Sequence, residues 1–156
     1  MFRVYATIDE RTTPAEVGTK ARRAEALGYD GLGVADGVHD GLLLAALALD
    51  ATTRLKVAIT VLVAFPRSPM TVAHAAWDLQ AMSGGRFELG LGAQVRGNIV
   101  VRYGVPWTPP VPRLREYLKS LRAIFTCFQE GGALRFEGAH YQFTRVQPFF
   151  TPGPSE

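Results

Sequence analysis

Apolar residues recur along the chain with two spacings, one typical of buried strands and one typical of amphipathic helices. Four short blocks are continuously apolar or alternate between apolar and other residues, and they predict strands at residues 2–8, 31–35, 55–65 and 87–92. The third block is almost entirely apolar and rich in β-branched side chains. This composition is typical of a strand buried on both faces.

A helix is predicted after each strand. Thr13, Pro14 and Glu16 supply a cap, a proline in the first turn and a glutamate that reaches back, so the first helix should run from there to Leu27. Gly28 should end it, because glycine tolerates the positive φ of a helix terminus. Two further helices are expected at residues 42–51 and 70–82.

The last third of the chain predicts a longer loop, a fourth helix and a hairpin. The helix shows an apolar stripe at spacings of three and four, and the stripe consists of Leu114, Leu118, Leu121 and Phe125. Residues 134–143 then predict a hairpin with its turn near Glu137 and Gly138.

Four consecutive strand-helix units predict an α/β fold, with a parallel sheet, right-handed crossovers and helices outside it. An open doubly wound sheet and a piece of a (β/α)8 barrel both satisfy this pattern. A complete barrel needs about 250 residues, so 156 residues hold about half of one. A half-barrel should order its strands 1-2-3-4. We expect one domain over residues 1–150 and a flexible tail over residues 151–156.

The composition narrows the range of functions. With 47% hydrophobic and 20% charged residues, the chain has the balance of a soluble globular protein. The net charge of +3 comes from scattered basic residues, which argues against nucleic-acid binding. Cys127 is the only cysteine, so neither a disulfide nor a thiolate metal site is expected. Without an apolar run of about 20 residues or a signal-peptide pattern, the sequence predicts a cytoplasmic protein that does not interact with membranes.

One segment carries a family resemblance. Residues 83–92, Ser-Gly-Gly-Arg-Phe-Glu-Leu-Gly-Leu-Gly, resemble the SGGRF-x-LGLG segment of the luciferase-like monooxygenase superfamily. The flanking residues 53–70 and 102–117 are similar to the strand, loop and helix on either side of it. Within the superfamily, the chain is most similar to an actinobacterial group of coenzyme F-420-dependent oxidoreductases.

The resemblance implies the N-terminal half of a (β/α)8 barrel, since complete members continue through four further strand-helix units. It also implies hydride transfer through coenzyme F-420 or FMN to a small organic substrate. The preference for F-420 follows from the subgroup alone. A nicotinamide fingerprint is not expected, because Gly90 and Gly92 lack a third glycine at the required spacing.

Barrel enzymes place their chemistry on the loops that follow the strands. After the second strand come Asp36 and His39, where the resemblance places cofactor-contacting or proton-handling residues. An imidazole there could donate to the edge of a reduced ring or carry a proton. The alternative is that Asp36 and Asp40 form turns and that His39 is a surface residue.

Further cofactor contacts are implied on the third and fourth strands. Thr60 and Val61 match the place of a β-bulge and a non-prolyl cis peptide in related enzymes, whereas the alternative is a plain buried strand. After the fourth strand, the candidates are Gly92, Ala93, Gln94 and Asn98. A glycine there lets the backbone approach a flat ligand, although glycine also serves packing alone.

For several other residues, the sequence predicts a structural role and no catalytic or metal-binding one. His74, Trp77 and Asp78 share one face of the third helix, where packing or a subunit interface is expected. His140 has no neighbouring ligand set, so no metal site is predicted. Cys127 should be a buried small hydrophobe.

Two hypotheses therefore remain open. One is an F-420- or FMN-dependent oxidoreductase, and the other is a non-catalytic half-barrel that serves as a binding or interaction module. In either case, open sheet edges and an uncovered apolar inner face predict a homo-oligomer or a chain that is unstable alone. The alternative is that the hairpin at residues 134–143 folds over one edge.

Overall fold

The computed structural model of the protein describes residues 2–154. The chain divides into two compact units, one formed by Met1–Leu62 with Asp78–Leu91 and the other by Val63–Trp77 with Gly92–Glu156. The tail expected at residues 151–156 is described as far as residue 154, and residues 155 and 156 lie outside the described range.

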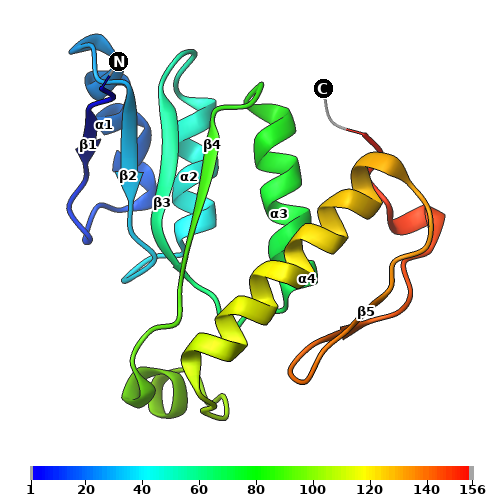
Figure 1. Ribbon diagram of the computed structural model, residues 1–156. Helices are drawn as coiled ribbons and strands as arrows, with labels where there is room; N and C mark the ends of the chain where they lie inside the picture. Colours follow the sequence, from blue (N-terminus) through cyan, green and yellow to red (C-terminus); the bar gives the residue numbers. More distant parts are fainter. Residues whose placement is uncertain (1, 155–156) are drawn as a thin grey trace. The chain divides into compact units, whose positions relative to one another are not determined.

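A four-stranded sheet orders its strands β1-β2-β3-β4 (Figure 1). The strands are Tyr5–Thr7, Gly31–Val34, Lys56–Val63 and Phe87–Gly92. The strands are parallel, and the register aligns Tyr5 with Gly31 and Gly31 with Lys56. This order confirms the prediction for consecutive barrel units and differs from the 3-2-1-4 order of doubly wound sheets. The fold is the four-strand half of a (β/α)8 barrel.

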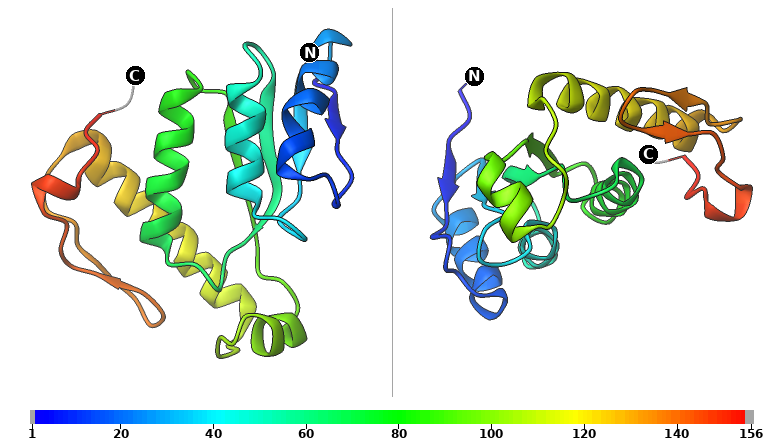
Figure 2. Two further views of the ribbon diagram at one scale, coloured as in Figure 1. Left: turned by 180° about the vertical axis from the view of Figure 1, so that it is seen from behind. Right: turned by 90° about the horizontal axis from the view of Figure 1, so that it is seen from below.

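Two helices cover one face of this sheet in the first unit (Figure 2). They are α1, Pro14–Ala26, and α2, Gly41–Asp50. The predicted start of α1 is confirmed, because the Glu16 carboxylate accepts the Thr13 N–H at 2.9 Å. The predicted end is confirmed as well, since Gly28 adopts a φ of 84°. The strand side chains beneath these helices are fully buried; they are Leu32, Val34, Val57 and Ile59.

The opposite face of the sheet, here called the open face, carries small and polar residues. The residues on it are Tyr5, Thr7, Gly31, Gly33, Lys56, Thr60, Glu88 and Gly90, with Ala58 and Val61 as its apolar members. The Tyr5 hydroxyl donates to Glu88 at 2.9 Å, and Lys56 Nζ lies 3.4 Å from the same carboxylate. The expectation of an apolar inner face is therefore wrong. β3 is buried on both faces at residues 57–59 and 62–63, as expected, but this burial is interrupted at Thr60, which is exposed, and at Val61, which is 47% exposed.

The third helix, α3, spans Pro69–Met82 and leads into β4 through a glycine turn. Gly84 and Gly85 take φ values of 60° and 84°, a region that side chains disfavour. The Ser83 hydroxyl accepts the Arg86 N–H at 3.1 Å and closes the turn. These residues begin the segment that carries the family resemblance.

Arg86 joins this turn to the rest of the first unit. Its guanidinium donates to the carbonyl oxygens of Ser83 at 2.8 Å, Leu49 at 3.0 Å and Leu55 at 3.0 Å, and to the Thr52 hydroxyl at 3.2 Å. It thereby ties the end of α2 and the start of β3 to the start of β4. Arg86 is a structural joint at the amino ends of the strands.

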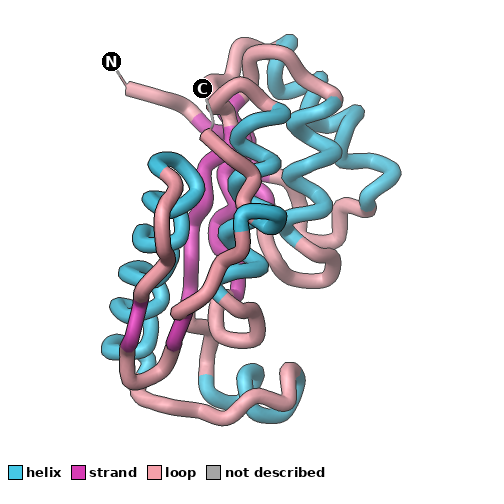
Figure 3. The backbone as a smooth tube through the Cα atoms, turned by 90° about the vertical axis from the view of Figure 1, so that its right-hand side faces the viewer, coloured by secondary structure: helices cyan, strands magenta, loops and turns pink. Residues whose placement is uncertain are grey.

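The second unit contains the fourth helix and the predicted hairpin. A π-helix, η1, occupies Asn98–Arg102 in the loop after β4, and α4 spans Pro110–Glu130. The strands β5, Phe136–Glu137, and β6, Gln142–Phe143, pair antiparallel and confirm the hairpin. The hairpin runs beside α4 (Figures 2 and 3), and a short 3-10 helix, η2, follows at Pro148–Phe150.

The buried stripe of α4 differs from the predicted one. Leu121 is buried as expected, but Leu118 is 42% exposed. The residues that fill the interior are Tyr117, Ser120, Leu121, Ile124, Cys127 and Phe128. The face predicted from leucine and phenylalanine positions is therefore rotated about the helix axis from the buried face. The prediction did not include Tyr117, which is buried and packs its ring against that of Tyr141 at 5.4 Å. The prediction that Cys127 is buried is confirmed.

The histidine and tryptophan of α3 pack against α4 within the second unit. The His74 ring lies 4.9 Å from that of Phe128, and the Trp77 ring stacks on Phe125 at 5.9 Å. The packing role predicted for these two side chains is confirmed. Asp78 belongs to the first unit and is exposed.

Glu116 of α4 holds the hairpin turn. Its carboxylate accepts the N–H groups of His140 and Tyr141 at 2.6 Å and of Ala139 at 3.1 Å. Gly138 lies so close to this carboxylate that a Cβ there would overlap it. Partial burial raises the pKa of Glu116, but these hydrogen bonds outweigh it and lower the pKa below its ordinary 4.5.

The hairpin should therefore detach in acid. Because the folded pKa is depressed, the contribution of Glu116 to stability is complete above about pH 4.5 and is lost as the pH falls through the folded pKa. We expect the amide NMR signals of His140 and Tyr141 to shift in this range. In Glu116→Gln, which cannot titrate, the same signals should lack this transition, and a transition unchanged in that variant would contradict the assignment.

In the part of the chain that the structure describes, no helix combines the length and the apolar character needed to cross a bilayer.

Candidate functional site

Asp36 and His39 lie in the loop between β2 and α2, at the carboxyl end of β2. Asp36 is half-buried, and its Oδ1 accepts the N–H of Gly41 at 3.0 Å. Asp40 caps α2 by accepting the N–H groups of Leu42 and Leu43 at 2.9 and 3.1 Å. Both aspartates thus shape the turn. His39 is half-buried, and its side chain forms no hydrogen bond to any described residue.

Thr60 and Val61 interrupt the burial of β3 and leave part of this strand accessible. The peptide bond between them is cis, which confirms the expectation at this position, while the β-bulge stays a prediction. Two glycines flank the pair. A Cβ at Gly33 would lie 3.3 Å from Thr60 Oγ1, and a Cβ at Gly90 would lie 3.5 Å from Val61 Cγ1. This region, here called the low surface, consists of backbone atoms, the Thr60 hydroxyl and the Val61 isopropyl group.

The remaining candidates belong to the second unit. The Gly92 carbonyl accepts the Ala64 N–H at 2.9 Å, which fixes the start of the loop. Gln94 has a φ of 59°, and its side-chain Oε1 accepts the N–H of Val95 at 2.9 Å. Asn98 opens the π-helix. Gly92, Ala93, Gln94 and Asn98 are all half-buried.

The candidates therefore fall into two groups, each placed within its own unit. In the first unit, Thr60 and Val61 lie with Gly33 and Gly90, whereas Asp36 and His39 are on the next loop. Gly33 was missed by sequence reasoning. The signal for it was the spacing of Gly31 and Gly33, since residues two apart on a strand share a face.

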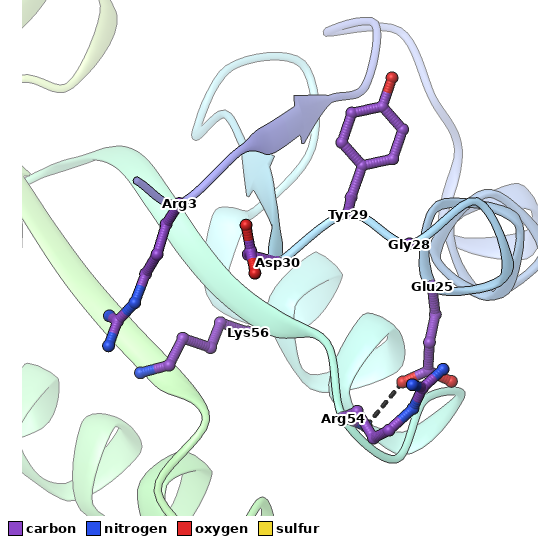
Figure 4. A pocket seen from close by; sticks show the side chains of 7 residues that line it. All are labelled: Arg3, Glu25, Gly28, Tyr29, Asp30, Arg54 and Lys56. Atoms are coloured by element: carbon purple, nitrogen blue, oxygen red, sulfur yellow. Dashed lines mark hydrogen bonds between the residues drawn. The ribbon is translucent and has the colours of Figure 1, made fainter. Parts of the chain in front are cut away.

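A pocket of about 290 Å³ opens at the other end of the strands in the first unit (Figure 4). It lies near the amino ends of β1, β2 and β3. Its lining carries three basic and two acidic side chains; the full set is Arg3, Glu25, Gly28, Tyr29, Asp30, Arg54 and Lys56.

The acidic side chains of this pocket accept hydrogen bonds from backbone N–H groups. Glu25 accepts the N–H groups of Thr53, Arg54 and Leu55 at 2.6 to 3.0 Å. Partial burial raises the pKa of Glu25, but these hydrogen bonds outweigh it and lower the pKa overall. Asp30 accepts the N–H of Val4 at 2.7 Å.

The basic side chains of the pocket lie beside carboxylates. Arg3 and Lys56 lie 3.7 and 3.4 Å from Glu88, and the Arg54 side chain lies beside Glu25 (Figure 4). The pocket lies at the amino ends of the strands. In (β/α)8 barrels, residues at this end contribute to stability, whereas the catalytic residues lie at the opposite end.

The four-stranded sheet ordered β1-β2-β3-β4, with helices between its strands, has the architecture of half a (β/α)8 barrel. The sequence matches the family described as luciferase-like monooxygenase over residues 1–156. The chain belongs to this family.

Three similar proteins illustrate the match. An uncharacterized protein of Mycobacterium tuberculosis is 43% identical over 144 residues, which cover 90% of this chain and 42% of that protein. The coenzyme F420 dependent tetrahydromethanopterin reductase of Methanopyrus kandleri has the same fold, with a TM-score of 0.77 and 17% identity, over 98% of this chain and 46% of that one.

The third is the oxygenating constituent of 3,6-diketocamphane monooxygenase from Pseudomonas putida, solved in complex with FMN. It gives a TM-score of 0.78 at 17% identity, over 100% of this chain and 51% of that one. The chain thus spans less than half the length of the mycobacterial relative and about half of each solved structure.

Proposed function

We propose that this chain supplies the ring-facing half of an oxidoreductase that uses coenzyme F-420 or FMN to transfer a hydride to a small organic substrate. Family membership supports the class of reaction. The two solved structures described above name F420 and FMN respectively. When bound, the cofactor would supply the redox chemistry, while the protein binds it, orients it and handles protons.

The observation that carries this proposal is the low surface around Thr60 and Val61. A strand residue with 47% exposure, flanked by glycines at Gly33 and Gly90, offers an uncovered apolar contact without side chains standing beside it. A flat tricyclic ring needs such a surface, because close approach of the backbone depends on small residues. The residues present therefore fit a flavin or a deazaflavin.

Polar groups on the loops would complete the site. His39 would donate or accept the proton, because its ring nitrogens can do both and its side chain has no competing hydrogen bond to a described residue. Asp36 would hold the loop through Gly41 and place His39. Taken by itself, the loop of the second unit carries Gly92 and Ala93, whose backbone could contact a ligand, and Gln94 and Asn98, whose side-chain amides could do so.

The test is cofactor binding by the chain and by Gly92→Leu. We expect the wild-type chain to quench F-420 or FMN fluorescence on titration and the variant to bind at least about 10-fold more weakly, because a side chain would hold the ring away from the backbone. Its unfolding midpoint in urea should change little. Gly97→Leu is the matched control, since a Cβ at Gly97 meets no atom within 4 Å.

Equal affinities of wild type and Gly92→Leu would remove the role of Gly92. A folded wild-type chain that binds neither cofactor would favour the non-catalytic binding module. We further propose that copies associate through the open edges of β1 and β4, because unpaired strand edges promote association.

A further inference from the structure

Arg113, near the start of α4, makes contacts that the proposed function does not use. Its guanidinium donates to the carbonyl oxygens of Phe65 at 3.2 Å and Pro106 at 3.1 Å. Its Nε donates to the Tyr141 hydroxyl at 3.0 Å. The guanidinium also lies 4.3 Å above the centre of the Phe65 ring. One side chain therefore holds three separate segments of the second unit.

Two of these segments adjoin the ends of the loop at residues 92–106. At its start, the Gly92 carbonyl accepts the N–H of Ala64, the residue next to Phe65, at 2.9 Å. At its end, Val105, the residue next to Pro106, donates to the Ile99 carbonyl at 3.0 Å. Arg113 thus bonds the Pro106 end of the loop directly and the Gly92 end indirectly, through the segment of Ala64 and Phe65.

Several large apolar side chains of the loop are exposed. Val95, Val100 and Val101 are 62%, 44% and 85% exposed, and Ile99 is its buried apolar anchor. A segment with few buried contacts opens easily unless polar bonds restrain it. A planar guanidinium with a fixed fork of donors is suited to join two carbonyl groups.

The guanidinium is itself restrained from the hairpin side. Tyr141, which accepts from Arg113, has its N–H bound by Glu116 at 2.6 Å and its ring 5.4 Å from that of Tyr117. Arg113 is half-buried, which strengthens its hydrogen bonds relative to those of an exposed arginine.

We propose that Arg113 is a positioning residue: it clamps the two ends of the loop at residues 92–106 and so fixes Gln94 and Asn98 for ligand contact. The bearing of the clamp on a cofactor rests on the proposed function. The clamp itself does not, and it is measurable without any ligand.

Hydrogen exchange of the full chain tests the clamp. In Arg113→Gln we expect the amides of Ile99 and Val105 to exchange at least about 10-fold faster, since the charge-assisted bonds to the carbonyl oxygens of Pro106 and of Phe65 beside the loop are lost. Arg113→Lys should restore part of the protection, because an ammonium can reach one carbonyl but not both. Arg115→Gln, exposed on the same helix, is the matched control and should leave the loop unchanged.

A general loss of stability is separated from positioning by Val17→Ala, which thins the core of the first unit, where Val17 is fully buried. This variant should lower the unfolding midpoint without faster exchange at residues 95–105. Loop exchange in Arg113→Gln equal to that in Arg115→Gln would overturn the proposal, as would the same acceleration in Val17→Ala.

Cofactor affinity provides the second readout. If the wild-type chain binds F-420 or FMN, Arg113→Gln should weaken binding about 10-fold while Arg115→Gln does not. Unchanged affinity would refute the link to the ligand. If the wild-type chain binds neither cofactor, the proposed function fails, and the exchange data still decide whether Arg113 clamps the loop.

Discussion

Replacing Arg86 by alanine is expected to lower the free energy of unfolding by about 3 kcal/mol, the largest effect among the substitutions considered, because hydrogen bonds from charged donors stabilise more than neutral ones. The Arg86 guanidinium bonds three carbonyl oxygens and one hydroxyl, drawn from the end of α2, the start of β3 and the turn before β4. Alanine would leave these acceptors to water or without partners. Urea unfolding followed by circular dichroism measures the loss.

Two further variants define the cause. Arg86→Lys should recover only part of the stability, because an ammonium cannot reproduce the fork of donors. Arg11→Ala removes an exposed arginine of the same unit and should change the free energy of unfolding by less than about 0.5 kcal/mol. Equal stability of the Arg86→Ala and Arg11→Ala proteins would show that the hydrogen bonds of Arg86 do not contribute to the free energy of unfolding.

Gly90→Ala is expected to cost about 2 to 3 kcal/mol, because overpacking a filled site forces the backbone to move. A Cβ at Gly90 would overlap the carbonyl oxygen of Ile59. That oxygen belongs to β3, which is fixed between its neighbouring strands. The same shift would disturb Val61, so ligand binding should fall together with stability.

Gly97→Ala is the matched comparison for this substitution. A Cβ at Gly97 meets no atom within 4 Å, and the residue has an ordinary helical φ of −57°. Thermal unfolding of the two variants should therefore differ by several degrees. Similar melting temperatures would mean that β3 and β4 adjust at little cost, which would contradict a rigid surface at Thr60 and Val61.

Much of the fold follows from the sequence because local rules dominate it. β4 spans residues 87–92 as predicted, since the turn at Gly84 and Gly85 ends one element and an apolar block begins the next. The start of α1 also follows from its cap. By contrast, β1 is shorter than the predicted 2–8, because its pairing with β2 extends only from Tyr5 to Thr7.

The candidate site was less accessible to prediction. The loops after β2 and β4 could be located from strand order alone, and the resemblance pointed to Thr60 and Val61. The roles of Arg86 and Arg113 could not be found in this way, because each binds a distant segment: Leu55 lies 31 residues from Arg86, and Phe65 lies 48 residues from Arg113. A π-helix at Asn98 was also invisible, since its hydrogen-bond spacing leaves no mark in an apolar pattern.

The joint formed by Arg86 also has an evolutionary consequence. The stretch Ser-Gly-Gly-Arg that links the chain to its relatives is engaged in holding the amino ends of the strands together, at the end of the sheet away from the loops that follow the strands. Selection for a chain that merely folds is enough to retain it. A descendant in which the loops after the strands had changed would still need the same four residues to fold. The stretch therefore traces the ancestry of the scaffold, whereas evidence for the proposed chemistry has to be sought in residues such as His39 and Asn98.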